Sequence, residues 1–138
     1  MPVKTEKPEQ LFAAVFVQKK RQERSLFELN SKKRRGDFFN KLCHRYFEIL
    51  DQRFMESIST SNFEEILKIL KREGAQEECY VLSTYEELDA KAKSLSQALE
   101  ECEGRGLPGI ILCVPDKLAY FEAEQEIGPP PRFLLKRN

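Results

Sequence analysis

Four cysteines and one histidine are the side chains with which this chain could hold a metal ion or attack a substrate. Only Cys43 and His44 are close in sequence. Adjacent residues on a helix point about 100° apart, so this pair cannot easily share one metal ion. Structural zinc sites usually draw their ligands from close pairs, and a nucleophilic cysteine needs a histidine within hydrogen-bond reach. The spacing therefore predicts no metal site, no catalytic residue and no cofactor.

A row of glutamates near the C-terminus offers oxygen ligands for a hard cation. Glu122, Glu124 and Glu126 share one face if this segment is a strand. Such a cation would need several carboxylates held together. Unpaired carboxylates along one strand more often form a solvated or edge-protecting surface. We therefore expect no cation site here.

A basic segment is the strongest candidate for binding chemistry. Lys19–Arg45 contains ten Lys/Arg residues against three Asp/Glu. Cations clustered on one surface bind nucleic acid or another polyanion, because neutralising phosphates supplies most of the affinity. Against this, the whole chain has a net charge of zero, whereas nucleic-acid-binding domains are usually strongly basic. The candidate anion-binding residues are Lys19, Lys20, Arg21, Arg24, Lys32, Lys33, Arg34, Arg35, Lys41 and Arg45.

The segment that carries the first of these cations has two alternative structures. The β-branched and aromatic residues of Leu11–Val17 and the alternation in Arg24–Asn30 favour two strands, joined as a hairpin by the polar residues between them. A continuous helix from Glu9 to Asn30 is the alternative, because periodicity does not separate the two structures in short apolar runs. We expect Phe27, like Phe38 and Phe39, to lie in the core rather than to stack on bases.

A long amphipathic helix is predicted to begin near Asp37. Apolar side chains recur there at spacings of three and four from Phe39 to Phe54, and they include Phe47. Lys41 and Arg45 fall on the opposite face, one turn apart, where both reach solvent.

A second helix has readable ends. Ser61 and Glu64 form an S-x-x-E capping box, and Gly74 supplies a C-terminal stop. A third helix is expected to begin near Thr84 or near Ser94, because each is followed three residues later by Glu or Gln. These caps predict where the helical layer ends and the sheet begins.

The remaining apolar runs are typical of strands. They are Cys79–Leu82, Gly109–Pro115, Lys117–Gln125 and Arg132–Arg137, and the second of them reads as a central strand. Strands and helices that interleave without regular alternation indicate an α+β fold. We predict a flexible N-terminus over residues 1–9, followed by a single domain over residues 10–138. That domain has a mostly antiparallel sheet, with two or three helices packed on one face.

The cysteines and the apolar runs indicate the compartment. None of the cysteines forms a C-x-x-C motif, and Cys79 and Cys113 lie inside apolar runs, where a free cysteine behaves as a small hydrophobic residue. The longest apolar run, Leu11–Val17, has seven residues, whereas a membrane span needs about 20. The basic run follows this segment, unlike in a secretory signal. We therefore expect a cytoplasmic protein with reduced thiols and no membrane contact.

The two halves of the chain carry opposite charge. Residues 1–54 contain 13 Lys/Arg and 7 Asp/Glu, and residues 55–138 contain 10 and 16. Opposite charges on two halves favour self-association or a charged partner. We therefore predict a small non-enzymatic binding or regulatory module that contacts a partner protein or forms a homodimer. The alternatives are nucleic-acid or polyanion binding through Lys19–Arg45 and, with less support, an enzyme without a local motif.

Overall fold

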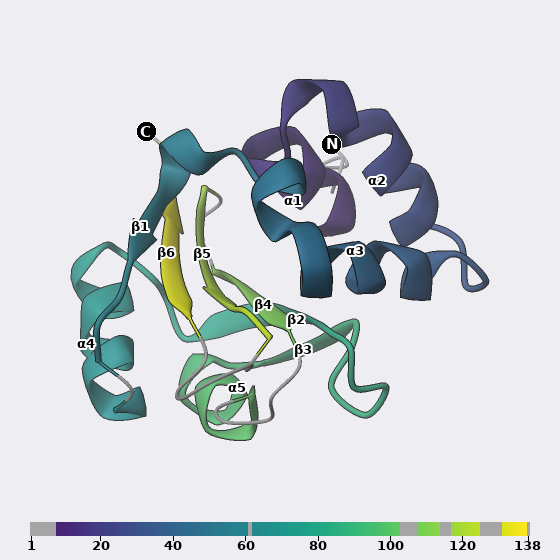
Figure 1. Cartoon of the computed structure of the whole chain (residues 1–138). Helices are drawn as coiled ribbons and strands as arrows, with labels where there is room; N and C mark the ends of the chain where they lie inside the picture. Colours follow the sequence, from purple (N-terminus) through teal and green to yellow (C-terminus); the bar gives the residue numbers. More distant parts are fainter. Residues whose placement is uncertain (1–7, 61, 103–107, 114–116, 125–130, 138) are drawn as a thin grey trace, which may run out of the picture.

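The computed structural model describes residues 8–60, 62–102, 108–113, 117–124 and 131–137. A six-stranded antiparallel sheet lies at its centre, in the order β1-β6-β5-β4-β2-β3 (Figure 1). This arrangement confirms the predicted α+β class and the antiparallel sheet. The strands are β1 (Met55–Ser57), β2 (Glu78–Ser83), β3 (Lys91–Ser94), β4 (Gly109–Cys113), β5 (Leu118–Glu122) and β6 (Arg132–Lys136).

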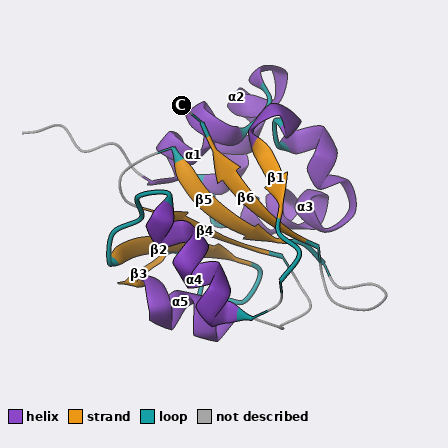
Figure 2. Ribbon diagram, turned by 90° about the vertical axis from the view of Figure 1, so that its left-hand side faces the viewer, coloured by secondary structure: helices purple, strands orange, loops and turns teal. Residues whose placement is uncertain are grey.

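Helices cover both faces of this sheet. Three helices pack on one face and two on the opposite face, whereas the prediction put all the helices on one face (Figures 1 and 2). Alternate residues along a strand serve the two layers: Leu82 and Phe121 face the first, whereas Val81 and Tyr120 face the second. The first layer comprises α1 (Pro8–Phe16), α2 (Gln22–Leu29) and α3 (Arg35–Ile49), and the second comprises α4 (Phe63–Arg72) and α5 (Leu95–Cys102).

The β-hairpin predicted for residues 11–30 is wrong, because this segment forms α1 and α2. The apparent alternation before Asn30 is a helical stripe in which Ser25, Glu28 and Leu29 are buried. A continuous helix is also wrong, because the backbone is extended at Gln18 (ψ 138°) and a short 3₁₀ turn, η1 (Lys19–Arg21), follows. The side-chain amide of Gln18 donates to the Leu50 carbonyl over 3.2 Å, which attaches the break between α1 and α2 to the end of α3.

The long helix α3 contains a kink that changes which side chains reach the core. Arg45 has non-helical angles (φ −145°, ψ 42°), so the apolar stripe does not continue in register beyond it. Phe47 is therefore 48% exposed, and the prediction that it is buried is wrong. Phe38 and Phe39 lie in the core as expected, but Phe27 on α2 is 53% exposed, which contradicts the prediction for that residue.

The second helical layer keeps most of its predicted ends. Asn62 caps α4, since its side-chain oxygen accepts from the backbone N–H groups of the second and third helical residues over 2.9 and 3.1 Å. The predicted partner in a capping box, Ser61, lies outside the described residues. Gly74 follows the helix with φ +109°, as a C-terminal stop requires. Helix α5 begins after Ser94, whose hydroxyl accepts from the Gln97 N–H over 3.3 Å, rather than after Thr84.

Candidate functional site

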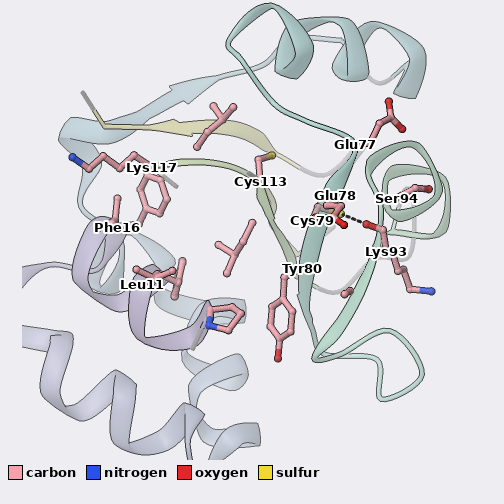
Figure 3. Close-up of a pocket in the computed structure, with 16 residues that line it drawn as sticks. Leu11, Phe16, Glu77, Glu78, Cys79, Tyr80, Lys93, Ser94, Cys113 and Lys117 are labelled. Carbon is pink, nitrogen blue, oxygen red and sulfur yellow. Dashed lines mark hydrogen bonds between the residues drawn. The ribbon is translucent and has the colours of Figure 1, made fainter. Parts of the chain in front are cut away.

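A groove of about 620 Å³ lies between α1 and the sheet (Figure 3). One wall comes from α1, and the other comes from β2, β3, β4 and the start of β5. This volume is within the range of roughly 300–1,000 Å³ that is usual for ligand sites. The apolar residues that line the groove include Leu11, Phe12, Val15, Phe16, Tyr80, Ala92, Leu112 and Leu118.

The groove exists because α1 is apolar on nearly every side, while the sheet covers only part of it. Six consecutive residues, 11–16, are apolar, and Phe12 is fully buried among them. Leu11 and Val15 on the same helix are only half-buried. On the sheet, Tyr80 and Leu112 are also half-buried. A helix that is apolar all round is normally covered all round, so this face of the molecule keeps apolar surface open to a ligand.

A polar network fixes the start of α1 against the sheet. The Arg35 guanidinium donates to both carboxylate oxygens of Asp89, over 2.6 and 3.0 Å, and lies 3.1 Å from the Glu9 carboxylate. The Tyr80 hydroxyl donates to Glu9 over 2.8 Å, and Asp89 accepts from the Ser83 N–H over 2.9 Å. One guanidinium therefore joins α1, α3, β2 and the loop before β3.

The network shifts the titration of its members. Burial raises the pKa of Tyr80, and the hydrogen bond to the Glu9 carboxylate raises it further, to about 12. Burial alone would lower the pKa of Arg35, but the hydrogen bonds and negative charges of Asp89 and Glu9 more than offset burial and raise that pKa. Arg35 is thus a permanent cation committed to the fold, so it is not available to an external anion.

The far end of α1 is held by the C-terminal strand. The Arg137 guanidinium donates to the Val15 carbonyl over 3.2 Å and lies 4.7 Å from the centre of the Phe54 ring. With both ends of α1 attached in this way, the helix keeps its distance from the sheet and the groove has a fixed width.

Charged residues lie on the rim of the groove. The Lys93 ammonium is paired with Glu101 over 2.6 Å, and Glu77 is paired with Lys71. Lys117 is exposed and makes no ion pair within the described ranges. Figure 3 shows Lys117 beside Phe16 on one side of the groove, with Glu77 and Glu78 on the other. The rim is therefore cationic at the end of α1 and acidic at the start of β2.

Two thiols lie at the edge of the groove. Cys79 and Cys113 are direct partners on β2 and β4, and both are free and buried, as expected. Burial raises the pKa of Cys79 to about 11. Burial, followed by the neighbouring Cys79, raises that of Cys113 to about 12. Both thiols stay protonated near neutral pH, which is the opposite of what a nucleophilic cysteine needs. His44 is exposed on α3 and contacts neither thiol in the described structure.

The glutamate row on β5 has a structural role. Glu122 is 2% exposed, accepts from the Tyr120 hydroxyl over 3.0 Å and lies 3.2 Å from the Arg132 guanidinium. The solvated surface expected for this residue is therefore wrong, because the carboxylate is part of an internal ion pair. Glu126 lies outside the described residues. In the portion of the chain that is described, no three Cys, His, Asp or Glu side chains come together as metal ligands would.

The basic segment is folded into two helices that run antiparallel. Arg21 on η1 lies 3.6 Å from Glu48, and Lys41 lies 2.8 Å from Glu28. These two pairs tie the start of α2 to the end of α3 and the end of α2 to the middle of α3. This register places Arg24 and Arg45 at the same level along the helix pair.

Half of the predicted anion-binding residues already have carboxylate partners. Arg24 and Lys41 share Glu28, and Arg34 pairs with Asp37 over 3.3 Å. Lys19 and Lys20 lie before α2, whereas Lys32 and Lys33 lie after it. The eight residues of α2 separate these two pairs of lysines by about 12 Å along the helix axis. The candidates that are exposed and have no ion pair within the described ranges are Lys19, Lys20, Lys32, Lys33 and Arg45.

Comparisons with known proteins gave no match to a protein-family model, a curated protein or a solved structure. No helix in the described part of the chain is long and apolar enough to span a bilayer. The groove was not among the sites predicted from the sequence. The signal that could have indicated it is the run Leu11–Phe16. Interpreted as a helix, this run has more apolar surface than one neighbouring layer covers.

Proposed function

We propose that the protein is a non-enzymatic binding module that takes an apolar ligand in the groove between α1 and the sheet. One observation carries the proposal: half-buried apolar side chains of α1 and of the sheet face each other across about 620 Å³. Covering them with a ligand would release about 25 cal/mol for each Å² of apolar surface removed from water. The charged groups stand at the rim, where they orient a ligand without opposing its entry.

A small ligand suits this geometry better than the other candidates. A partner protein or a second copy, expected from the charge pattern, would bury roughly 800 Å² on each side of a standard interface, whereas this groove is local and concave. An enzyme is disfavoured because the thiols that line the groove, Cys79 and Cys113, have raised pKa values. A cytoplasmic location remains part of the proposal.

An NMR titration with 1-decanol, a neutral apolar probe, tests the proposal. We expect the amide signals of Leu11, Val15, Ala92 and Leu112 to shift with one dissociation constant, while those of α4 stay in place. Ala92 is exposed on β3 and lines the groove, so Ala92→Leu fills the site without disturbing the core. This variant is expected to bind decanol at least about tenfold more weakly, since the added side chain occupies the ligand's space.

The matched control is Ala14→Leu. Ala14 is exposed on the same helix but does not line the groove, so decanol should bind this variant within about twofold of the unmodified chain. Equal binding by the Ala92→Leu variant, or shifts spread over α4 and α5, would show that the groove is not a ligand site.

Polyanion binding is a second candidate function. It is favoured by the antiparallel register, which puts Lys19 and Lys20 ahead of α2 at the same end of the helix pair as Arg45 near the end of α3. Fluorescence anisotropy with a single-stranded oligonucleotide at low ionic strength tests it. Each phosphate contact contributes a slope of about −0.7 to the dependence of log affinity on log salt.

Charge-neutral variants make this test specific. Combining Lys20→Gln with Arg45→Gln should reduce the salt slope by about one to two. The control Lys68→Gln, on the exposed side of α4 in the opposite layer, should leave it unchanged. Affinity that is absent at low salt, or equal losses from the control, would exclude this function.

A further inference from the structure

We infer that the groove selects an apolar chain that ends in a carboxylate, with the carboxylate at Lys117 and the chain lying between α1 and the sheet. This inference rests on the proposed function, because it names the class of ligand for the same groove. Three observations support it: the uneven charge of the rim, the backbone conformation of Lys117 and the apolar interior.

The charge of the rim separates its two ends. Among the described lining residues that carry charge, the ammonium of Lys93 is already neutralised by Glu101. Glu77 is likewise neutralised by Lys71, whereas Glu78 is exposed at the start of β2, has no ion pair among the described residues and repels an anion from that side. Lys117 is the lining cation that keeps its charge available within the described ranges. An anionic head group is therefore attracted to one end of the groove and repelled from the other.

The second cation at that end reinforces the same polarity. Arg137 donates to the Val15 carbonyl through its guanidinium, which keeps the side chain in place. Its backbone N–H donates to the Lys117 carbonyl over 3.0 Å, so a second positive charge lies near Lys117 although the guanidinium itself is engaged. Lys117, by contrast, has a flexible stem and an ammonium that can follow a ligand.

The backbone of Lys117 is strained. Its φ of +77° lies in the left-handed region, where glycine or asparagine is the usual residue and other side chains are disfavoured. The Lys117 carbonyl accepts from the Arg137 N–H over 3.0 Å, which holds this conformation. Lys117 thus combines a strained backbone with an ammonium that has no ion pair among the described residues, a combination that favours a role in binding. Figure 3 places this exposed lysine beside Phe16 at one end of the groove, with its ammonium directed away from the other lining side chains.

The described interior of the groove is mainly apolar. Leu11, Val15 and Leu112 line it with aliphatic side chains, and the hydroxyl of Tyr80 is already bound to Glu9. An unbranched hydrocarbon chain suits such a surface. Each further methylene that the groove buries should tighten binding roughly three- to fourfold, until the chain is longer than the groove.

Three ligands with the same ten-carbon chain provide the test: decanoate, 1-decanol and decyltrimethylammonium. Dissociation constants are measured by NMR titration of the full chain. We expect decanoate to bind roughly two- to fivefold more tightly than decanol, as suits one partly exposed ion pair, and the cation to bind most weakly. The preference for decanoate should shrink as salt is added, because exposed charges are screened.

Lys117→Gln keeps the length of the stem and removes the charge. This variant should lose the preference for decanoate over decanol, whereas the control Lys68→Gln should keep that preference. Equal affinity for decanoate and decanol in the unmodified chain, or tighter binding of the cation, would overturn the inference and leave the proposed function standing. Failure of all three ligands to bind would remove the proposed function as well. The comparison of ligands needs no variant, so it decides the matter even if Lys117→Gln does not fold.

Discussion

Replacing Arg35 with methionine should destabilise the fold far more than the same change at its neighbour Arg34. The Arg35 side chain is 17% exposed, and its partners Glu9 and Asp89 are 10% and 16% exposed. Arg35→Met would leave both carboxylates partly buried without a counterion. It would also remove the 2.7 Å hydrogen bond to the Leu29 carbonyl, which secures the end of α2.

The magnitude follows from burial. Removing one partner of a fully buried ion pair destabilises a protein by about 3–5 kcal/mol, because the remaining charge is desolvated and unpaired. The residual exposure of this network lets water offset part of that loss, so we expect about 2–4 kcal/mol for Arg35→Met. Arg34 is 56% exposed, and its pair with Asp37 spans 3.3 Å on the helix surface. Its replacement should therefore change the free energy of unfolding by no more than about 0.5 kcal/mol.

Urea unfolding followed by circular dichroism measures both variants at neutral pH. The midpoint should fall for Arg35→Met with an unchanged slope, since the surface exposed on unfolding is the same. A loss smaller than about 1 kcal/mol, or equal losses from the two arginines, would refute the view that Arg35 is a structural cation. The outcome also bears on nucleic-acid experiments: neutralising all of Lys32–Arg35 would unfold part of the protein, so Arg35 must be left intact.

Three further predictions concern the backbone and the titrating groups. Gly74→Ala should destabilise the fold by about 1–2 kcal/mol in thermal unfolding, because φ is +109° at this position. Gly36→Ala, inside α3 with open space around it, should instead stabilise the fold by up to about 1 kcal/mol. Changes of the same sign in the two variants would contradict this prediction. Tyr80, with its pKa raised to about 12, contributes stability that is complete below about pH 10 and is lost as pH rises through 12. Urea unfolding at about pH 9 and about pH 11.5 should therefore show a larger alkaline loss for the unmodified chain than for Tyr80→Phe, and equal losses would exclude this role. Cys79 and Cys113 should react with a thiol reagent near neutral pH at least about a hundredfold more slowly than free cysteine, and rapid labelling of the folded protein would contradict their raised pKa values.

The elements that could be predicted from the sequence are those whose apolar pattern fits only one type of secondary structure. The strand predicted over Cys79–Leu82 and the strands near Gly109, Leu118 and Arg132 are confirmed. These apolar runs are short, and prolines lie beside several of them, which favours a strand over a helix. The short edge strands β1 and β3 were missed. Their sequences, Met55–Ser57 and Lys91–Ser94, contain charged and small residues, and their pairing depends on neighbours distant in the chain.

The error over residues 11–30 has a different cause. A seven-residue apolar run fits a buried strand and a buried helix equally well, and long-range packing decides between them. Here the choice depends on Glu9, whose carboxylate joins Tyr80 and Arg35, and on Arg137 at the other end of the chain. These partners are up to 122 positions away, so no local pattern contains them.

The site was predictable only in part. The cations of Lys19–Arg45 are visible as a cluster in the sequence. The carboxylates that neutralise several of them, such as Glu28 and Glu48, are selected by the packing of α2 on α3. The groove depends on surface that is left uncovered. How much of α1 the sheet covers depends on the extent of the sheet, and this is set only when the helical layer packs on the sheet.

The position of β6 has a consequence for how the protein is made in the cell. This strand lies between β1 and β5, and it pairs Leu135 with Met55, 80 positions earlier in the chain. Until Arg132–Lys136 has left the ribosome, both flanking strands have an edge with no partner. Pairings over such distances form slowly, and unpaired edges promote aggregation of a nascent chain. The sheet therefore forms completely only after its final strand has been synthesised. During most of synthesis, the N-terminal helices lack the complete sheet on which they pack in the folded protein.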